Sequence, residues 1–224
     1  MFKFNFCAFF LINVLACNNA EPTSHKVVEK PKPVQTVKTI KVSKIVAKDE
    51  TPMKIQKRIV PAKPRSIVIG KAKESFKKFR RRVKNKSIIT IIDYDISRRQ
   101  DRLWVIDMKT NKILLQSKVS HAGNSGNLYA DIFSNKPNSN TSSKGSFVTV
   151  KKPFDGKYGY SLRVKGLEKG VNHNALRRGI IFHPNNGSTW SYGCFMTDNG
   201  FNDELIDTIV GGTFVYVHKG ERNI

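Results

Sequence analysis

The 224-residue sequence predicts a mainly β fold with one or two helices, preceded by a long basic segment. Three observations lead to this prediction. From residue 87 onward, short runs of β-branched and aromatic residues recur between Gly, Asn, Asp and Pro. In this part of the chain only one stretch, near the C-terminus, has clear helical periodicity, which argues against alternating strands and helices. The positive charge is concentrated before residue 87, where apolar residues are scarce.

The first seventeen residues, MFKFNFCAFFLINVLAC, have the composition of an export signal. Lys3 precedes an apolar run over residues 4–16, which as a helix is about 20 Å long and too short for a bilayer core of about 30 Å. A charged start, a short apolar centre and small residues at its end are typical of a signal peptide. Residues 14–17 resemble a bacterial lipobox, which predicts lipidation of Cys17 and a membrane-anchored protein of the bacterial envelope or periplasm. Ordinary cleavage after Ala20 and a structural N-terminal helix are the alternatives.

Residues 18–86 have the composition of a disordered basic linker. They hold 21 Lys/Arg against 5 Asp/Glu, whereas residues 87–224 hold 18 against 12. Like-charge repulsion and low apolar content disfavour a packed core in this linker. Within it, Phe76, Phe79 and Val83 are at helical spacing, which predicts an amphipathic helix over residues 74–86 lying on an anionic envelope surface. A solvated basic linker is the alternative, and no nucleic-acid partner is expected, because an exported chain rarely meets nucleic acid.

Residues 87–224 are expected to form the folded domain, mostly from short strands. SIITIIDYDIS is an apolar, β-branched run typical of a buried strand, and DRLWVIDMKTNKILLQSKVS indicates two strands around a Lys-Thr-Asn-Lys turn. Further strands are expected in KGSFVTVKK, YSLRVKGL, RGIIFH and GTFVYVHK. Between the last two, DNGFNDELIDTIVGG predicts a helix with an Asn or Asp cap, three apolar residues on one face and a Gly-Gly stop.

The sequence contains no signature of a cofactor or a metal. GNSGN lacks both the Lys-Ser/Thr of a phosphate loop and a following helix. His121, His173 and His218 have no cysteine or carboxylate spacing typical of a zinc site. We therefore expect no cofactor and no metal, with His173 in a surface turn and His218 in a structural role.

Cys194 is the candidate nucleophile. It follows His183 after ten intervening residues, and removal of the signal would leave it as the only thiol of the chain. An imidazole can lower the pKa of a thiol and accept its proton, and a short loop after a strand-end His183 would bring the two side chains together. The amides of Tyr192, Gly193 and Cys194 would then converge as an oxyanion hole. A buried structural cysteine is the alternative.

Four ordered blocks of the chain are SHAGNSG, FSNKPNSNTSSKGSF, GYSLRVKGLEKGVNHNA and IIFHPNNGSTWSYGC. Together they resemble the catalytic domain of the bacterial murein L,D-transpeptidases, the YkuD-type family, and the resemblance runs from about residue 88 to residue 218. The first block is similar to the SHxxNSG segment of one subfamily. The resemblance implies a β-sandwich or barrel domain in which Cys194 attacks peptidoglycan stem peptides. It implies His183 as the base, with Ser191 and Gly193 shaping the catalytic loop.

The reaction implied by the resemblance is acyl transfer through a cysteine thiolate. Cys194 would attack the carbonyl on the L-centre side of an L,D peptide bond in a tetrapeptide stem and expel D-alanine. A diamino-acid side-chain amine, a lipoprotein lysine or water would then resolve the acyl-enzyme, as an L,D-transpeptidase, a lipoprotein-attaching enzyme or an L,D-carboxypeptidase respectively. The sequence leaves this acceptor open. A catalytically idle, peptidoglycan-binding envelope lipoprotein that uses its basic tail is the alternative.

Three features depart from the family pattern, and they bear on substrate preference and on the strength of activity. Pro184 stands where glycine usually follows the histidine, Tyr192 stands where His, Arg or Trp is common, and FMTD follows the cysteine without the usual Pro or Arg. Two further residues are candidates for lining the substrate site. His121 is a rival base or fixes a nearby loop, and Trp190 would form a groove wall together with Tyr192.

Overall fold

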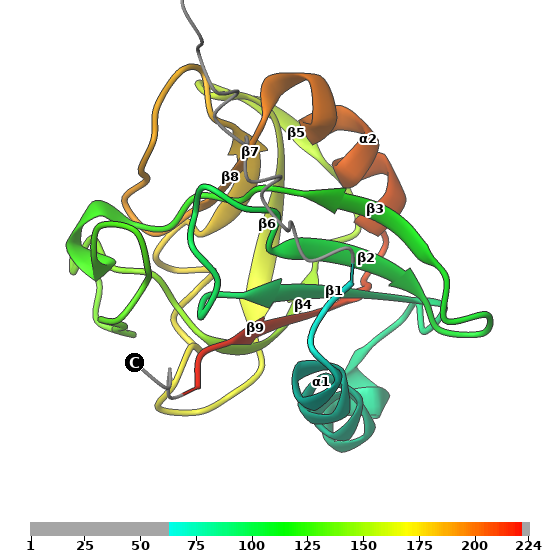
Figure 1. The fold of residues 1–224 in the computed structure, drawn as a ribbon. Coiled ribbons are helices and arrows are strands. Elements are labelled where there is room, and N and C mark those ends of the chain that lie inside the picture. The colour runs from blue at the N-terminus through cyan, green and yellow to red at the C-terminus, as the bar shows by residue number, and fades with distance from the viewer. Residues whose placement is uncertain (1–62, 221–224) are drawn as a thin grey trace, which may run out of the picture. The chain divides into compact units, whose positions relative to one another are not determined.

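The computed structural model describes residues 63–220, which form a mainly β fold with two α-helices (Figure 1). The expected signal, Cys17 and most of the expected linker lie outside the described residues. In chain order the elements are α1 (Ser66–Phe79), a 3-10 turn (Arg80–Arg82), β1 (Ile88–Asp93), β2 (Leu103–Asp107), β3 (Ile113–Ser117), a second 3-10 turn (Gly123–Ser125), β4 (Gly145–Thr149), β5 (Phe154–Gly156), β6 (Gly159–Gly166), β7 (Ile181–Pro184), β8 (Phe195–Thr197), α2 (Asn199–Ile209) and β9 (Phe214–His218).

The strands form one sheet that curves round on itself as a barrel- or sandwich-like fold (Figure 1), which confirms the predicted fold class. Their order is β3-β2-β1-β9-β4-β6-β7-β8, and β5 pairs with β6 beside this path. Two neighbouring pairs are parallel, β1 with β9 and β7 with β8, and the other pairs are antiparallel. The short strands β5 and β8 were not expected from the sequence, and β8 is the one that follows Cys194.

The parallel pair β1 and β9 is buried on both faces of the sheet. Ile92 and Val217 lie in the main core, whereas Ile89 and Phe214 lie in a second core cluster on the other side. A strand with both faces covered needs apolar residues without alternation. This explains why the first predicted strand is a nearly continuous run of Ile and Thr.

Helix α2 covers the main core beside β6 and β7, and it confirms the predicted C-terminal helix. Leu205, Ile206 and Ile209 are fully buried on its inner face. The helix ends before Gly211 and Gly212, whose φ angles of 91° and 87° are those that favour glycine. Asp198 occupies the N-cap position without a side-chain bond to the helix amides.

Helix α1 differs from the expected amphipathic helix over residues 74–86 in a linker. It begins at Ser66, and its buried residues Val68, Ala72 and Phe76 pack in the second core cluster. The rings of Phe76 and Phe214 meet edge to face with centroids 5.5 Å apart, and Ser75 hydrogen-bonds Ser146 of β4. The folded domain therefore begins with α1. The apolar face of this helix packs against the sheet and not against a membrane surface. Neither described helix is long and apolar enough to cross a bilayer.

Candidate active site

The parallel pairing of β7 and β8 brings His183 and Cys194 to the same face of the sheet. Phe182 pairs with Phe195, and their rings lie 4.9 Å apart in the main core. Side chains alternate between faces along a strand. His183 follows Phe182 on β7, and Cys194 directly precedes Phe195. Both side chains therefore point away from the core.

His183 and Cys194 line one pocket of about 220 Å³. Its remaining walls come from the β5–β6 turn, the end of β7, the loop before Cys194 and Met196 of β8. The pocket lining is largely aromatic and apolar, which suits a peptide backbone or an apolar side chain more than a free ion. The lining residues other than His183 and Cys194 are Tyr158, Pro184, Asn185, Asn186, Ser188, Trp190, Ser191, Tyr192 and Met196.

The hydrogen bond of His183 fixes which ring nitrogen is basic. Nδ1 lies 2.8 Å from the carbonyl oxygen of Pro184, and because a carbonyl can only accept, Nδ1 carries the proton. Nε2 is then the unprotonated nitrogen, able to take a proton from a thiol. The side chain is 4% exposed, and its burial lowers the pKa of His183 despite the bond to Pro184. His183 is therefore a neutral base at pH 7.

Tyr158 holds the imidazole of His183 in place. The two rings are stacked with centroids 4.6 Å apart and an interplanar angle of 23°. Tyr158 lies in the turn between β5 and β6, and its carbonyl accepts a hydrogen bond from Asn186. Gly159 brings this turn against Pro184, since a Cβ atom there would lie 3.3 Å from Pro184 Cγ. The sequence analysis missed Tyr158, because nothing along the chain links this turn to His183.

The thiol of Cys194 is half-buried and donates to the carbonyl of Gly179 at 3.6 Å. Burial raises the pKa of Cys194, while the Ile181 backbone and the charge of Arg178 act to lower it, and burial prevails. The resting thiol is therefore protonated at pH 7, in contrast to the lowered pKa that an adjacent imidazole was expected to produce. Attack by this thiol needs a base that removes its proton.

Arg178 supports the backbone next to Cys194. Its Nη1 donates to Ser134 O and Ser143 Oγ, both at 2.6 Å, and its Nη2 donates to Thr141 O at 2.6 Å and Ser139 Oγ at 3.2 Å. One guanidinium thus holds the 134–143 loop beside Cys194. The sequence analysis missed Arg178, although a charged residue directly before the apolar GIIF run was visible in the sequence.

The loop before Cys194 is held by Ser191. Ser191 Oγ donates to the carbonyl of Cys194 at 2.7 Å and accepts the amide N–H of Gly193 at 3.1 Å. This geometry fits the loop-shaping role expected of Ser191 and Gly193. Three amides were expected to form an oxyanion hole, and that of Gly193 already donates to Ser191 Oγ. The amides of Tyr192 and Cys194 remain as candidates for this role.

His121 lies behind the loop and does not line the pocket. Its side chain is fully buried, with Nδ1 accepting from Arg102 at 2.9 Å and Nε2 donating to Gly126 O at 2.9 Å. Burial and the neighbouring charge of Arg102 lower the pKa of His121 to about 4. Its carbonyl accepts the amide N–H of Ser191 at 3.2 Å. His121 thus fixes the SHAGNSG segment against the catalytic loop, and the pocket has no rival base at this position.

Trp190 and Tyr192 form the exposed rim of the pocket. They are 50% and 77% exposed, respectively, and both contribute to its lining. The Arg98 guanidinium lies 4.6 Å from the centre of the Trp190 ring, which holds that side chain from behind. Their part in binding a substrate stays a prediction.

A sequence profile of the L,D-transpeptidase catalytic domain matches residues 62–218. The chain belongs to this family. Solved L,D-transpeptidase structures from Xylanimonas cellulosilytica, Stackebrandtia nassauensis and Mycobacterium smegmatis are similar at 18%, 15% and 15% identity, with TM-scores of 0.39, 0.40 and 0.38. The alignments cover 60%, 63% and 59% of this chain and 62%, 60% and 59% of those proteins, respectively. The chain thus spans about three fifths of their length. No curated protein sequence matches it significantly.

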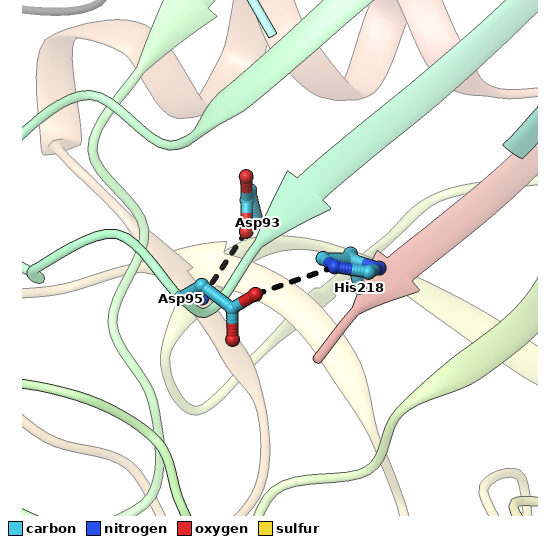
Figure 2. A group of neighbouring side chains, drawn as sticks. All are labelled: Asp93, Asp95 and His218. Atoms are coloured by element: carbon cyan, nitrogen blue, oxygen red, sulfur yellow. Dashed lines mark hydrogen bonds and ion pairs between the residues drawn. The ribbon is translucent and has the colours of Figure 1, made fainter. Parts of the chain in front are cut away.

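A second polar cluster of this L,D-transpeptidase-family domain lies at the carboxyl ends of β1 and β9. Figure 2 shows Asp93, Asp95 and His218, whose ligand-type atoms lie within 4.8 Å of one another. Asp95 accepts from Arg65 at 2.7 Å and Lys219 at 3.0 Å, and Asp93 accepts two bonds from Arg65. Because two cations already neutralise both carboxylates, the cluster fits an ion-pair network better than a metal site.

This network ties the N-terminal end of the domain to the sheet. Arg65 immediately precedes α1, and Lys219 immediately follows β9. Burial alone would raise the pKa of Asp95, but the bonds from Arg65 and Lys219 outweigh it and lower the pKa to about 2. Burial lowers the pKa of His218, whose Nε2 lies 3.3 Å from Asp95. Its position in this network agrees with the structural role expected for His218.

Proposed function

We propose that this domain transfers the acyl group of a peptidoglycan stem peptide through a thioester on Cys194. The observation that carries the proposal is the placement of Cys194 and His183 in one pocket, with the imidazole in the tautomer whose Nε2 is basic. Membership of the L,D-transpeptidase family supplies the substrate class. The L,D peptide bond of a tetrapeptide stem is then the bond that is cleaved.

The acylation step follows from the protonation states in the pocket. A neutral His183 and a protonated Cys194 form a pair in which Nε2 takes the thiol proton as Sγ bonds to the substrate carbonyl carbon. The tetrahedral oxygen faces the amides of the catalytic loop. Collapse of this intermediate breaks the carbon–nitrogen bond, and protonated His183 returns the proton to the leaving amine of D-alanine. The product is an acyl-enzyme with a neutral imidazole.

The second half of the reaction reverses these proton transfers with a different nucleophile. Neutral His183 removes a proton from the acceptor as it attacks the thioester, and Cys194 leaves as the thiol. An amine of a diamino acid gives a cross-link, a lipoprotein lysine gives an attached lipoprotein, and water gives a shortened stem. Export, a lipid anchor on Cys17 and binding of the basic segment to an anionic envelope surface complete the proposed setting.

The test uses the full mature chain and purified disaccharide-tetrapeptide fragments, with products read by mass spectrometry. We expect loss of D-alanine from the fragments together with a cross-linked or hydrolysed product. The Cys194→Ala protein, purified identically, is the matched control and should give neither. A correctly folded wild-type protein that releases no D-alanine but still binds the fragments would support the idle wall-binding alternative.

A further inference from the structure

A second pocket lies beside the nucleophile pocket and shares part of its wall. It has a volume of about 330 Å³. Asn185, Ser188 and Met196 line both pockets. The two pockets are therefore adjacent, and a peptide seated over Cys194 lies next to this second space. Two residues that line the second pocket are joined through their main chain, because the Ser120 amide donates to Met196 O at 2.8 Å.

Positive charge gathers in the second pocket. Arg98, Arg99 and Lys118 contribute to its lining, and Asp198 is the carboxylate there. Asp198 Oδ1 accepts a hydrogen bond from Asn185 at 3.0 Å. Across residues 63–220, none of the three cations is within ion-pair distance of a carboxylate, whereas Arg65 and Lys219 each pair with two carboxylates. A pocket with surplus cations attracts an anionic group.

Arg98 is held in position before any ligand arrives. Its Nη1 donates to Thr189 O at 2.9 Å, its guanidinium covers the Trp190 ring, and its amide donates to Leu128 O at 2.9 Å. The side chain therefore loses little further conformational freedom when it binds a ligand. A guanidinium also matches the planar geometry of a carboxylate.

We propose that the pocket lined by Arg98, Arg99 and Lys118 binds a carboxylate of the stem peptide that reacts at Cys194. This inference rests on the proposed function and deepens it, because it names the group that the site recognises beyond the reacting bond. A donor tetrapeptide carries a carboxylate at its C-terminus. An acceptor such as diaminopimelate carries one on the same carbon as its reacting amine, whereas a lysine side chain does not. If the pocket recognises the carboxylate of the acceptor, it would favour a diaminodicarboxylic acid over a lysine side chain as the acceptor.

The experiment measures binding by calorimetry to the full mature chain with Cys194→Ala, so that no turnover occurs. The probes are the tetrapeptide stem with a free or an amidated C-terminus, and free diaminopimelate compared with Nα-acetyl-lysine amide, whose side-chain amine has no carboxylate on its carbon. The pocket variant adds Arg99→Gln and Lys118→Gln and leaves Arg98, which supports Thr189 and Trp190. The control adds Lys109→Gln and Lys112→Gln instead, two exposed lysines outside both pockets.

We expect the pocket variant to weaken binding of the carboxylate-bearing probe by roughly tenfold, the size of a lost charge-assisted contact. The control should bind as the parent does. If the pocket variant binds the free stem more weakly than the control does, but the amidated stem equally well, the recognised group is the C-terminus of the donor. If the two proteins differ only in their binding of diaminopimelate, the recognised group belongs to the acceptor. Equal binding by the pocket variant and the control, or equal losses for charged and uncharged probes, would overturn the proposal.

The failure of this proposal is distinguishable from failure of the proposed function. The binding measurement uses a protein without the nucleophile, whereas the proposed function is tested by D-alanine release from the wild type. A wild type that releases D-alanine, together with a pocket variant that binds normally, would overturn only the carboxylate site. A carboxylate-dependent loss of binding without any D-alanine release would overturn only the acyl transfer.

Discussion

Arg178 Nη2 lies 3.3 Å from the position that a Cβ atom would occupy on Gly193, the residue before Cys194. The guanidinium thus touches the backbone that precedes Cys194, while its hydrogen bonds hold the 134–143 loop. Its charge lowers the pKa of Cys194 and partly offsets the effect of burial. Arg178 is therefore a positioning residue that also stabilises the thiolate.

Replacement of Arg178 should change the ionisation of the thiol. Arg178→Gln removes the positive charge, so the pKa of Cys194 should rise further and the pH profile of iodoacetamide alkylation should move to higher pH. Arg178→Lys retains the charge and should shift the profile less. Alkylation rates measured from pH 6 to 11, with Cys194→Ala as the unlabelled control, test this. Coincident profiles for wild type and Arg178→Gln would show that Arg178 has only a packing role.

A side chain at position 193 should damage the catalytic loop. Gly193 has φ of 131°, and a Cβ atom would lie 2.9 Å from Ile180 Cδ1 and 3.0 Å from Thr141 O. Gly193→Ala should therefore lower the free energy of unfolding by about 1–3 kcal/mol and reduce D-alanine release more than its stability loss explains. Gly187→Ala is a matched control, because Gly187 also has positive φ but nothing lies within 4 Å of its Cβ position. Equal activity losses in the two variants would contradict the prediction.

His183 should be indispensable for turnover and should work below the pH at which a histidine normally protonates. His183→Ala should reduce turnover by about 10²- to 10⁴-fold, the usual contribution of a general base. Because burial lowers the pKa of His183, the base remains neutral, and the acid limb of the rate profile should lie below the ordinary histidine pKa. The profile of kcat/KM against pH measures this. A limb at or above pH 6.5 would contradict it, since 6.5 is the ordinary value.

The ring of Tyr158 should matter more than its hydroxyl. Tyr158→Phe keeps the stack on His183 and should retain most of the turnover, whereas Tyr158→Ala removes the stack and should lower kcat. The measurement is steady-state D-alanine release by both variants. Equal loss in Tyr158→Phe and Tyr158→Ala would indicate that the hydroxyl, and not the ring, is needed.

The α1 helix should be required for folding, although its composition resembles a linker. Phe76→Ala should lower the free energy of unfolding by about 3–5 kcal/mol, as expected for a buried phenylalanine. The control Ile67→Ala removes a side chain that is 61% exposed and should cost less than about 0.5 kcal/mol. Chemical denaturation of the full chain tests both variants. A deletion that ends at residue 62 should leave the domain folded, and one that ends at residue 86 should not.

The ion-pair network should make stability depend on acidity. The pKa of Asp95 falls from 3.8 to about 2 in the folded protein, so the folded state binds fewer protons than the unfolded chain. Its contribution is complete above about pH 4 and is lost as the pH falls towards 2. Thermal melts at several pH values should show this loss, which Asp95→Asn should remove. An unchanged pH dependence in Asp95→Asn would assign the acid sensitivity to other groups.

The sequence alone determined the mainly β fold and the two candidate catalytic residues. Predicted strands correspond to β1, β2, β3, β4, β6, β7 and β9, and the pattern of Leu205, Ile206 and Ile209 correctly predicted α2. These features are local, because the spacing of apolar residues along a strand or helix shows which of its faces is buried. Cys194 and His183 were identified because a reactive residue type in an ordered block is visible without any coordinates.

Only the tertiary structure decided where the domain begins and how its site is supported. Four lysines stand among the apolar residues of α1, three arginines follow it directly, and the buried partner Phe214 lies near the other end of the chain. Likewise, Tyr158 meets His183 across two strands, and Arg178 reaches a loop more than thirty residues earlier. The carbonyl of Pro184 sets the His183 tautomer, and burial sets the protonation of Cys194. Such effects depend on which segments pack together and how much water they exclude, and a linear sequence does not display either quantity.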